Sequence, residues 1–178
     1  VVVVSHPMKI IVPVKQVPEV AEVKVNPETG TLIRDGVPSI LNPFDELAVE
    51  EAIKIKETHG GEDSEVVIIT MGPPQAKDAL YKALAMGGDR AVHLTDMAFA
   101  GADTWATSYT LGEAAKKLGF DLIICGRQAI DGDTAQIGPQ MAEHLKIPQI
   151  TYVKNVEMGD GKIICQRALE DGYERVEA

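Results

Sequence analysis

The chain is short of cysteine, of basic residues and of long apolar runs. Two cysteines in 178 residues cannot build a disulfide framework, which favours a reducing compartment, so we expect a cytoplasmic protein. Asp and Glu outnumber Lys and Arg by 27 to 17, and the net charge of −10 makes nucleic acid an unfavourable partner. Apolar runs stay below the roughly 20 residues of a membrane span, so we expect no direct membrane insertion.

Patterns typical of metal sites and of nucleophilic catalysis are also missing. The four histidines are scattered, without partners at the spacing of metal ligands. Asp131 and Asp133 do not begin an EF-hand, because the other oxygen ligands and the glutamate at the twelfth position are lacking. Cys125 is interpreted as a buried, inert thiol. The sequence therefore predicts no metal site, no catalytic side chain and a protein that is not itself an enzyme.

What the chain does contain is an alternation of apolar and amphipathic segments. The predicted core strands are residues 8–14, 65–71, 91–94 and 120–125, and the predicted helices are residues 43–59, 75–86, 104–118 and 136–145. Such alternation implies right-handed crossovers and an α/β fold with a doubly wound, mostly parallel sheet and helices on both faces. We also expect a β-hairpin excursion at residues 23–33 and late antiparallel strands after residue 149. Residues 1–7 are interpreted as a tail, and residues 8–178 as a single nucleotide-binding domain.

The segment from Leu122 to Pro139 carries the strongest functional signal. An apolar run stops at Gly126, a small polar loop follows, and a helix is predicted from residue 136. A helix N-terminus beyond the carboxyl end of a buried strand favours an anionic ligand, and in open α/β sheets ligands bind in that crevice. The alternative is a capped helix with nothing bound, in which Asp131 or Asp133 is the N-cap. Spacing alone leaves both interpretations open.

Other predicted strand ends belong to the same crevice. Pro13 ends the first strand and Met71 ends the second, so their backbone groups could contact an adenine edge, although Met71 could equally be core. Asn42 followed by Pro43 predicts a capped helix start. The apolar faces of the first and third helices are expected to include Leu47, Trp105 and Tyr109.

Charged residues of both signs are expected around the crevice. Lys15 and Arg127 flank it and could neutralise a phosphate, or they could be solvated surface cations. Two carboxylates beside a phosphate would repel it. We therefore expect Asp131 and Asp133 to turn towards a ribose, the backbone or solvent.

Four stretches resemble the β subunit of electron transfer flavoproteins, in the order of that family. They are Val12 to Val17, Gly36 to Glu46, Ala83 to Ala91 and Gly126 to Gln136. The likeness runs from about Met8 to the end of the chain, where residues 165–176 resemble the start of the C-terminal signature of the family. The continuation of that signature is lacking, so we interpret the chain as C-terminally incomplete.

The resemblance implies an adenine nucleotide α-hydrolase-like fold and a heterodimer with an electron transfer flavoprotein α subunit, with dehydrogenases as electron donors. The β subunit holds AMP in most members and a second FAD in electron-bifurcating members. Gly132 and Thr134-Ala135 look like the bifurcating or nitrogen-fixation branch, which favours FAD. The residues expected to bind this cofactor are Pro13, Asn42, Pro43, Phe44, Asp45, Met71, Gln128, Ala129, Ile130, Asp131, Gly132, Asp133, Thr134, Ala135, Gln136, Ile137, Gly138 and Pro139.

Two other classes of nucleotide-binding protein are the alternatives to this interpretation, and the sequence fits each of them less well. A stand-alone ATP- or AMP-binding module like a universal stress protein is shorter, and it lacks the hairpin at 23–33 and the late strands. An ATP pyrophosphatase needs a Ser-Gly-Gly loop after its first strand. This chain has Val14-Lys15-Gln16 there.

Overall fold

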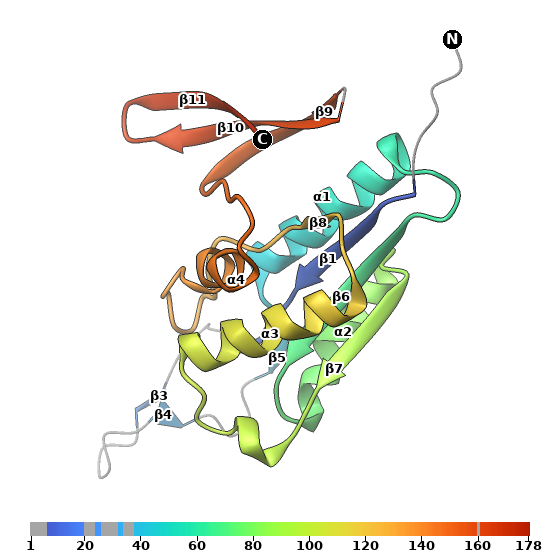
Figure 1. The fold of residues 1–178 in the computed structure, drawn as a ribbon. Helices are drawn as coiled ribbons and strands as arrows, with labels where there is room; N and C mark the ends of the chain where they lie inside the picture. The colour runs from blue at the N-terminus through green and yellow to red at the C-terminus, as the bar shows by residue number, and fades with distance from the viewer. Residues whose placement is uncertain (1–6, 20–23, 26–31, 34–37, 160) are drawn as a thin grey trace.

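A computed structural model describes residues 7–19, 24–25, 32–33, 38–159 and 161–178. Its centre is a four-stranded parallel sheet (Figure 1). The strands are β1 (Lys9–Pro13), β6 (Glu65–Met71), β7 (Arg90–Leu94) and β8 (Leu122–Ile123). Their order is β7-β6-β1-β8, so the chain reverses its direction of winding beside β1. The topological switch point therefore lies between β1 and β8, and such sheets bind ligands beyond the carboxyl ends of the strands at that point.

Helices cover both faces of this sheet, which confirms the predicted doubly wound α/β fold (Figure 1). Strand side chains alternate between the faces, as the pleat requires. Ile10, Val12 and Ile68 pack with α1 (Pro43–His59) and α2 (Lys77–Ala85), whereas Ile11, Val67 and Ile69 pack with α3 (Thr104–Leu118) and α4 (Ile137–Leu145). Short 3₁₀ turns, η1 (Pro74–Ala76) and η2 (Met97–Phe99), precede α2 and α3. None of the described helices is long and apolar enough to cross a membrane.

Two small antiparallel pairs lie between β1 and α1 in the sequence. The hairpin excursion is present as β3 (Lys24–Val25) paired with β4 (Leu32–Ile33), while the turn predicted between them lies outside the described residues. A second pair, β2 (Gln16–Pro18) and β5 (Ser39–Leu41), was not predicted. This pair brings the chain back to the end of β1, because Asn42 N donates to Lys15 O at 2.9 Å. The start of α1 is thereby held beside the switch point.

The late strands form a separate antiparallel sheet in the order β11-β10-β9, seen at the top of Figure 1. They are β9 (Val153–Gly159), β10 (Lys162–Leu169) and β11 (Gly172–Glu177). Val156 and Met158 of β9 pack against the α1 and α2 side of the core. The prediction of late antiparallel strands is confirmed, although the first begins four residues later than residue 149.

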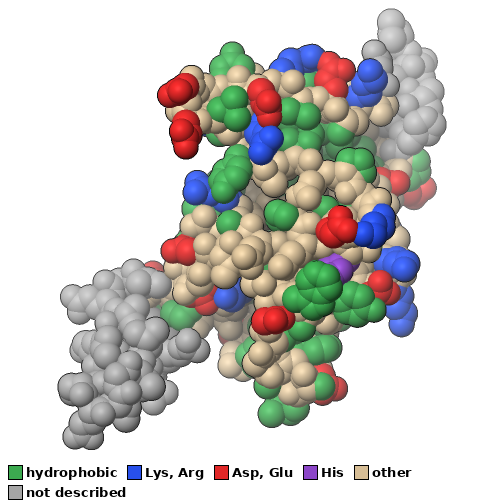
Figure 2. Space-filling view, turned by 60° about the vertical axis from the view of Figure 1, so that its left-hand side comes forward, with side chains coloured by type: hydrophobic (Ala, Val, Ile, Leu, Met, Phe, Trp, Pro, Cys, Tyr) green, Lys and Arg blue, Asp and Glu red, His purple; other side chains and the backbone are tan. Residues whose placement is uncertain are grey.

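Three apolar residues do not lie where their spacing predicted. Leu47, Trp105 and Tyr109 are 63%, 61% and 53% exposed, so their assignment to buried helix faces was wrong. Trp105 and Tyr109 instead pack edge-on against His144 of α4, at ring-centroid distances of 4.5 and 5.4 Å. In Figure 2, hydrophobic side chains lie exposed beside a histidine, among acidic and basic groups. Buried Ser108, Leu111, Gly112 and Ala115 make the inner face of α3. Leu111 and Ala115 pack with the sheet, and Gly112 lies beside His144 and Leu145 of α4.

Candidate functional site

The ends of three parallel strands meet at one edge of the sheet. Backbone bonds continue beyond the strands there, from Val14 N to Ile69 O at 2.8 Å and from Ile124 N to Ile11 O at 3.0 Å. Pro13, Met71 and the start of the loop at Gly126 therefore lie along the same edge. The prediction that these three segments lie at the same edge of the sheet is confirmed.

The loop between β8 and α4 is held in shape by its own groups. Asp133 N donates to Ala129 O at 2.9 Å, and Gln128 Nε2 donates to Asp133 Oδ1 at 2.7 Å. Asp133 and Ala135 have left-handed backbones, with φ of 51° and 53°. Non-glycine residues adopt that conformation at an energetic cost, and such residues gather at ligand-binding sites.

The first turn of α4 has free donors. Gln136 occupies the N-cap position without a side-chain cap, so the interpretation of Asp131 or Asp133 as the cap was wrong. In the described part of the chain, no acceptor is placed for the backbone N–H groups of residues 134–138. Unpaired N–H groups at a helix N-terminus attract anions. Ile137, Gly138 and Pro139 form this turn, and a Cβ added at Gly138 would lie 3.3 Å from Cys125 Cβ, so the turn packs closely against the segment after β8.

Asn42 links the start of α1 to this loop, in contrast to its predicted role as a side-chain cap. Its side chain makes no cap hydrogen bond, and α1 begins with the Asn42 carbonyl accepting from Asp45 N at 2.9 Å and Glu46 N at 3.0 Å. The carboxamide instead donates through Nδ2 to Gln128 O at 2.8 Å and accepts from Ile130 N at 3.2 Å. The predicted N-cap position of Asn42 and the start of α1 at Pro43 are confirmed, but the expected side-chain cap bond is not made, because a partner 86 residues away in sequence takes the amide.

Asp45 is a buried carboxyl behind the same loop. Its Oδ2 accepts from Lys15 N at 2.8 Å. Burial raises the pKa of Asp45 to about 7, against the opposing effects of hydrogen bonds from the Lys15 backbone and Asn42. Burial, and then the nearby Asp45 carboxylate, raise the pKa of the Cys125 thiol to about 12, so this thiol is a poor nucleophile at neutral pH.

The cations predicted at the crevice already have partners. Lys15 Nζ forms an ion pair with Asp131 at 2.7 Å, and the Arg127 guanidinium lies 5.2 Å from the ring centroid of Tyr152. Asp131 and Asp133 are both exposed to solvent, as one of the expected alternatives had it, and they also pair with the Lys15 and Gln128 side chains. This pairing neutralises Asp131, which reduces its repulsion of an anion at the loop.

Three residues that support the loop carried no such prediction in the sequence. Lys15 was considered only as a phosphate cation, although its backbone and side chain join α1 to the loop. Gly126 marked the end of a strand, but its contact with Asp45 gave no sequence signal. Thr104 of α3, whose Oγ1 donates to Gln136 Oε1 at 2.9 Å, was not considered. Of the expected residues, Pro43 is exposed and Phe44 half-buried in the first turn of α1.

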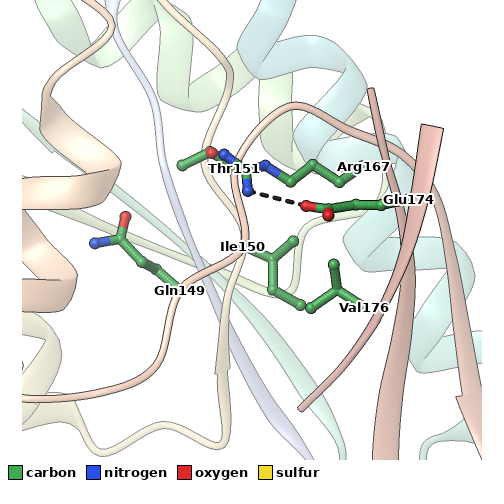
Figure 3. A pocket seen from close by; sticks show the side chains of 6 residues that line it. All are labelled: Gln149, Ile150, Thr151, Arg167, Glu174 and Val176. Carbon is green, nitrogen blue, oxygen red and sulfur yellow. Dashed lines mark hydrogen bonds and ion pairs between the residues drawn. The ribbon is translucent and has the colours of Figure 1, made fainter. Parts of the chain in front are cut away.

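A hollow lies between the segment after α4 and the late sheet (Figure 3). Ile150 and Val176 line it, as do Arg167 and Glu174, which are opposite residues of β10 and β11 and form an ion pair at 3.0 Å. It contains none of the predicted cofactor residues. Among the described residues, no group of three or more His, Cys, Asp or Glu side chains is placed to hold a metal ion.

Comparisons with known proteins agree with the resemblance. A family model described as the electron transfer flavoprotein domain matches residues 29–178. The electron transfer flavoprotein subunit beta of Thermoanaerobacterium thermosaccharolyticum is 59% identical over 170 residues, which are 96% of this chain and 64% of the relative. Subunit CarD of the caffeyl-CoA reductase-Etf complex of Acetobacterium woodii is 56% identical, over 96% of this chain and 64% of the relative. Protein FixA of Azorhizobium caulinodans is 47% identical, over 94% of this chain and 61% of the relative. The chain thus spans less than two thirds of the length of these relatives.

Proposed function

The chain belongs to the electron transfer flavoprotein family, and on that premise we propose that it is a β subunit that holds an adenine nucleotide. In this role it passes electrons as a heterodimer with an α subunit, with dehydrogenases as the electron donors, in the cytoplasm. The observation that carries the nucleotide site is the row of backbone N–H groups at residues 134–138, which have no acceptor among the described residues. The row lies at the switch point of the sheet, where a nucleotide phosphate suits both the donors and the helix dipole.

The residues at the crevice fit an adenosine phosphate. The N–H groups of residues 134–138 and the exposed Thr134 hydroxyl would hold the phosphate. The ends of β1 and β6, at Pro13 and Met71, would border the adenine. A bound flavin supplies the redox chemistry, while the protein supplies binding, orientation and electrostatics.

We favour FAD over AMP as the nucleotide in this subunit. Relatives at 56% and 47% identity carry the names of a caffeyl-CoA reductase-Etf subunit and of FixA, in line with the branch suggested by Gly132 and Thr134-Ala135. FAD contains the adenosine monophosphate unit of AMP, so the same loop and strand ends serve either molecule. The choice between them depends on whether the crevice admits the rest of the dinucleotide.

We expect the protein, expressed together with its α subunit, to carry an adenine nucleotide in the β subunit. Denaturation with acid followed by chromatography should release FAD in excess of one per heterodimer, or one FAD together with one AMP. The isolated β chain should still bind added AMP in calorimetry, because the crevice is formed within the chain. A folded heterodimer that releases one FAD and no other adenine nucleotide would contradict the proposal.

Thr134→Ala should separate nucleotide binding from folding. The Thr134 hydroxyl is exposed, so its loss should change the free energy of unfolding by less than about 0.5 kcal/mol. If it donates to a phosphate, AMP affinity should fall by about 1.5–3 kcal/mol, the range for hydrogen bonds to charged groups. Calorimetric titration and urea unfolding measure the two quantities. Thr110→Ala on α3 is the matched control and should leave both unchanged; unchanged affinity in Thr134→Ala would place the phosphate elsewhere.

A further inference from the structure

The Asn42 carboxamide connects two segments that are far apart in the sequence. It belongs to the residue before α1, is 1% exposed, and contacts the backbone of the loop between β8 and α4. Nδ2 donates to Gln128 O at 2.8 Å and Oδ1 accepts from Ile130 N at 3.2 Å. A carboxamide that hydrogen-bonds to the carbonyl of residue i and to the N–H of residue i+2 in another segment imitates the backbone of a neighbouring strand. It holds that segment at a fixed distance from α1.

The polar groups of Asn42 are occupied by protein. An Asn side chain offers two N–H donors and one carbonyl acceptor. One donor serves Gln128, the acceptor serves Ile130, and a hydrogen bond from the amide also lowers the pKa of the Asp45 carboxyl. The side chain is therefore buried and bonded to the loop through both its amide and its carbonyl.

We propose that Asn42 is a positioning residue, which shapes the nucleotide loop by clamping the backbone of Gln128 and Ile130. This inference rests on the proposed nucleotide-binding function. The clamp lies just before the turn at residues 130–132, and the free N–H groups of residues 134–138 follow that turn. Fixing residues 128–130 therefore fixes where those donors point, so the site is ordered before the nucleotide arrives.

Two substitutions of Asn42 test the clamp: one removes the carboxamide, and the other replaces its donor with an acceptor. Asn42→Ala removes both hydrogen bonds and leaves Gln128 O and Ile130 N unpaired, so AMP affinity should fall about tenfold or more at every pH. Asn42→Asp keeps the size and shape of the side chain. Its ionised carboxylate is only a hydrogen-bond acceptor, so it cannot donate to the Gln128 carbonyl oxygen and is repelled by it. At low pH the protonated acid has one O–H donor and one carbonyl acceptor, as Asn does. The affinity of Asn42→Asp should therefore fall about 10-fold to 100-fold at pH 8 and return to within about 3-fold of the parent at pH 5.

The measurement is calorimetric titration with AMP from pH 5 to 8, expressed as the ratio of variant to parent affinity at each pH. The ratio cancels the titration of AMP. The ionisable groups around the clamp are Asp45 on α1, Lys15 after β1, Cys125 after β8, and Asp131 and Asp133 in the loop, and Asn42→Ala, which adds no charge beside them, shows how far they change the ratio with pH. Asn155→Asp in β9 is the matched control and should keep a ratio near one. Recovery at low pH in Asn42→Asp, without recovery in Asn42→Ala, identifies the lost donor as the cause.

Amide hydrogen exchange in the free protein gives a readout that does not need the ligand. The Ile130 amide should exchange about tenfold faster in Asn42→Ala, while amides of β6 keep their protection. If the parent binds AMP and both variants bind it equally well at pH 8, the inference is wrong and the nucleotide proposal stands. If the parent binds neither AMP nor FAD, the proposed function is wrong, and Ile130 exchange decides whether the clamp exists. Unchanged exchange in Asn42→Ala overturns the inference by itself.

Discussion

Gly126→Ala should destabilise the protein by about 3 kcal/mol or more and should abolish measurable AMP binding, because the added methyl group has no space. A Cβ at this position would overlap Asp45 Oδ1, and it would lie 2.8 Å from the Phe44 carbonyl carbon and 2.9 Å from Asp45 N. Two of these atoms are backbone, so a rotamer change cannot relieve the overlap. The start of α1 would have to move away from β8, and Asn42 would move with it.

Gly132→Ala is the matched control for this experiment. Gly132 lies in the same loop, and an added Cβ would meet nothing within 4 Å. Its substitution should change the free energy of unfolding by less than about 0.5 kcal/mol. Urea unfolding followed by circular dichroism, together with AMP titration, measures both variants. Equal stability of the two variants would show that α1 and the end of β8 are less closely packed than the structure has them.

Asp45→Asn should change how the stability of the protein depends on pH. Burial raises the pKa of Asp45 from its ordinary value of 3.8 to about 7 in the folded protein. Between these values the unfolded chain releases a proton that the folded chain keeps, so the free energy of unfolding should fall as pH rises from 4 to 7. The fall attributable to Asp45 should be roughly 4 kcal/mol, at 1.36 kcal/mol for each pKa unit, and it should level off above pH 7.

The variant lacks this titration, so its stability relative to the parent should improve by roughly 4 kcal/mol between pH 4 and pH 8. Urea unfolding at half-unit intervals of pH measures the difference. Asp131→Asn serves as the control, because it removes an exposed ion pair with Lys15, which contributes at most about 1 kcal/mol, and leaves Asp45 intact. Parallel curves for the parent and Asp45→Asn would show that the Asp45 carboxyl is solvated or fully paired in the folded state.

Local patterns in the sequence were sufficient to predict the main elements of the fold. The observed bounds of β6 and α3 coincide with the predicted segments 65–71 and 104–118. Apolar runs of strand length and helical periodicity are properties of neighbouring residues, so they can be recognised without knowing the partner. β8 is only two residues long, shorter than the predicted 120–125, because only Leu122 and Ile123 pair in register with β1.

The location of the candidate site also followed from the sequence. The order of strand, polar loop and helix from Leu122 to Pro139 placed a helix N-terminus at the edge of the sheet, and the parallel topology brought Pro13 and Met71 to the same edge. This prediction needed only the chain direction and the rule that parallel strands end together.

The tertiary structure alone decided which side chains support that site. Asn42 before Pro43 is a sound local signal for a helix cap, yet a loop 86 residues away binds its carboxamide. Lys15 had no sequence mark that paired it with Asp131, and nothing near Asp45 in sequence predicted that its carboxyl would be buried beside Gly126. The sequence alone therefore determined the helices, the strands and the place of the loop, because neighbouring residues specify them. The partners of Asn42, Lys15 and Asp45 depend on distant segments, which meet only after the core between sheet and helices has packed.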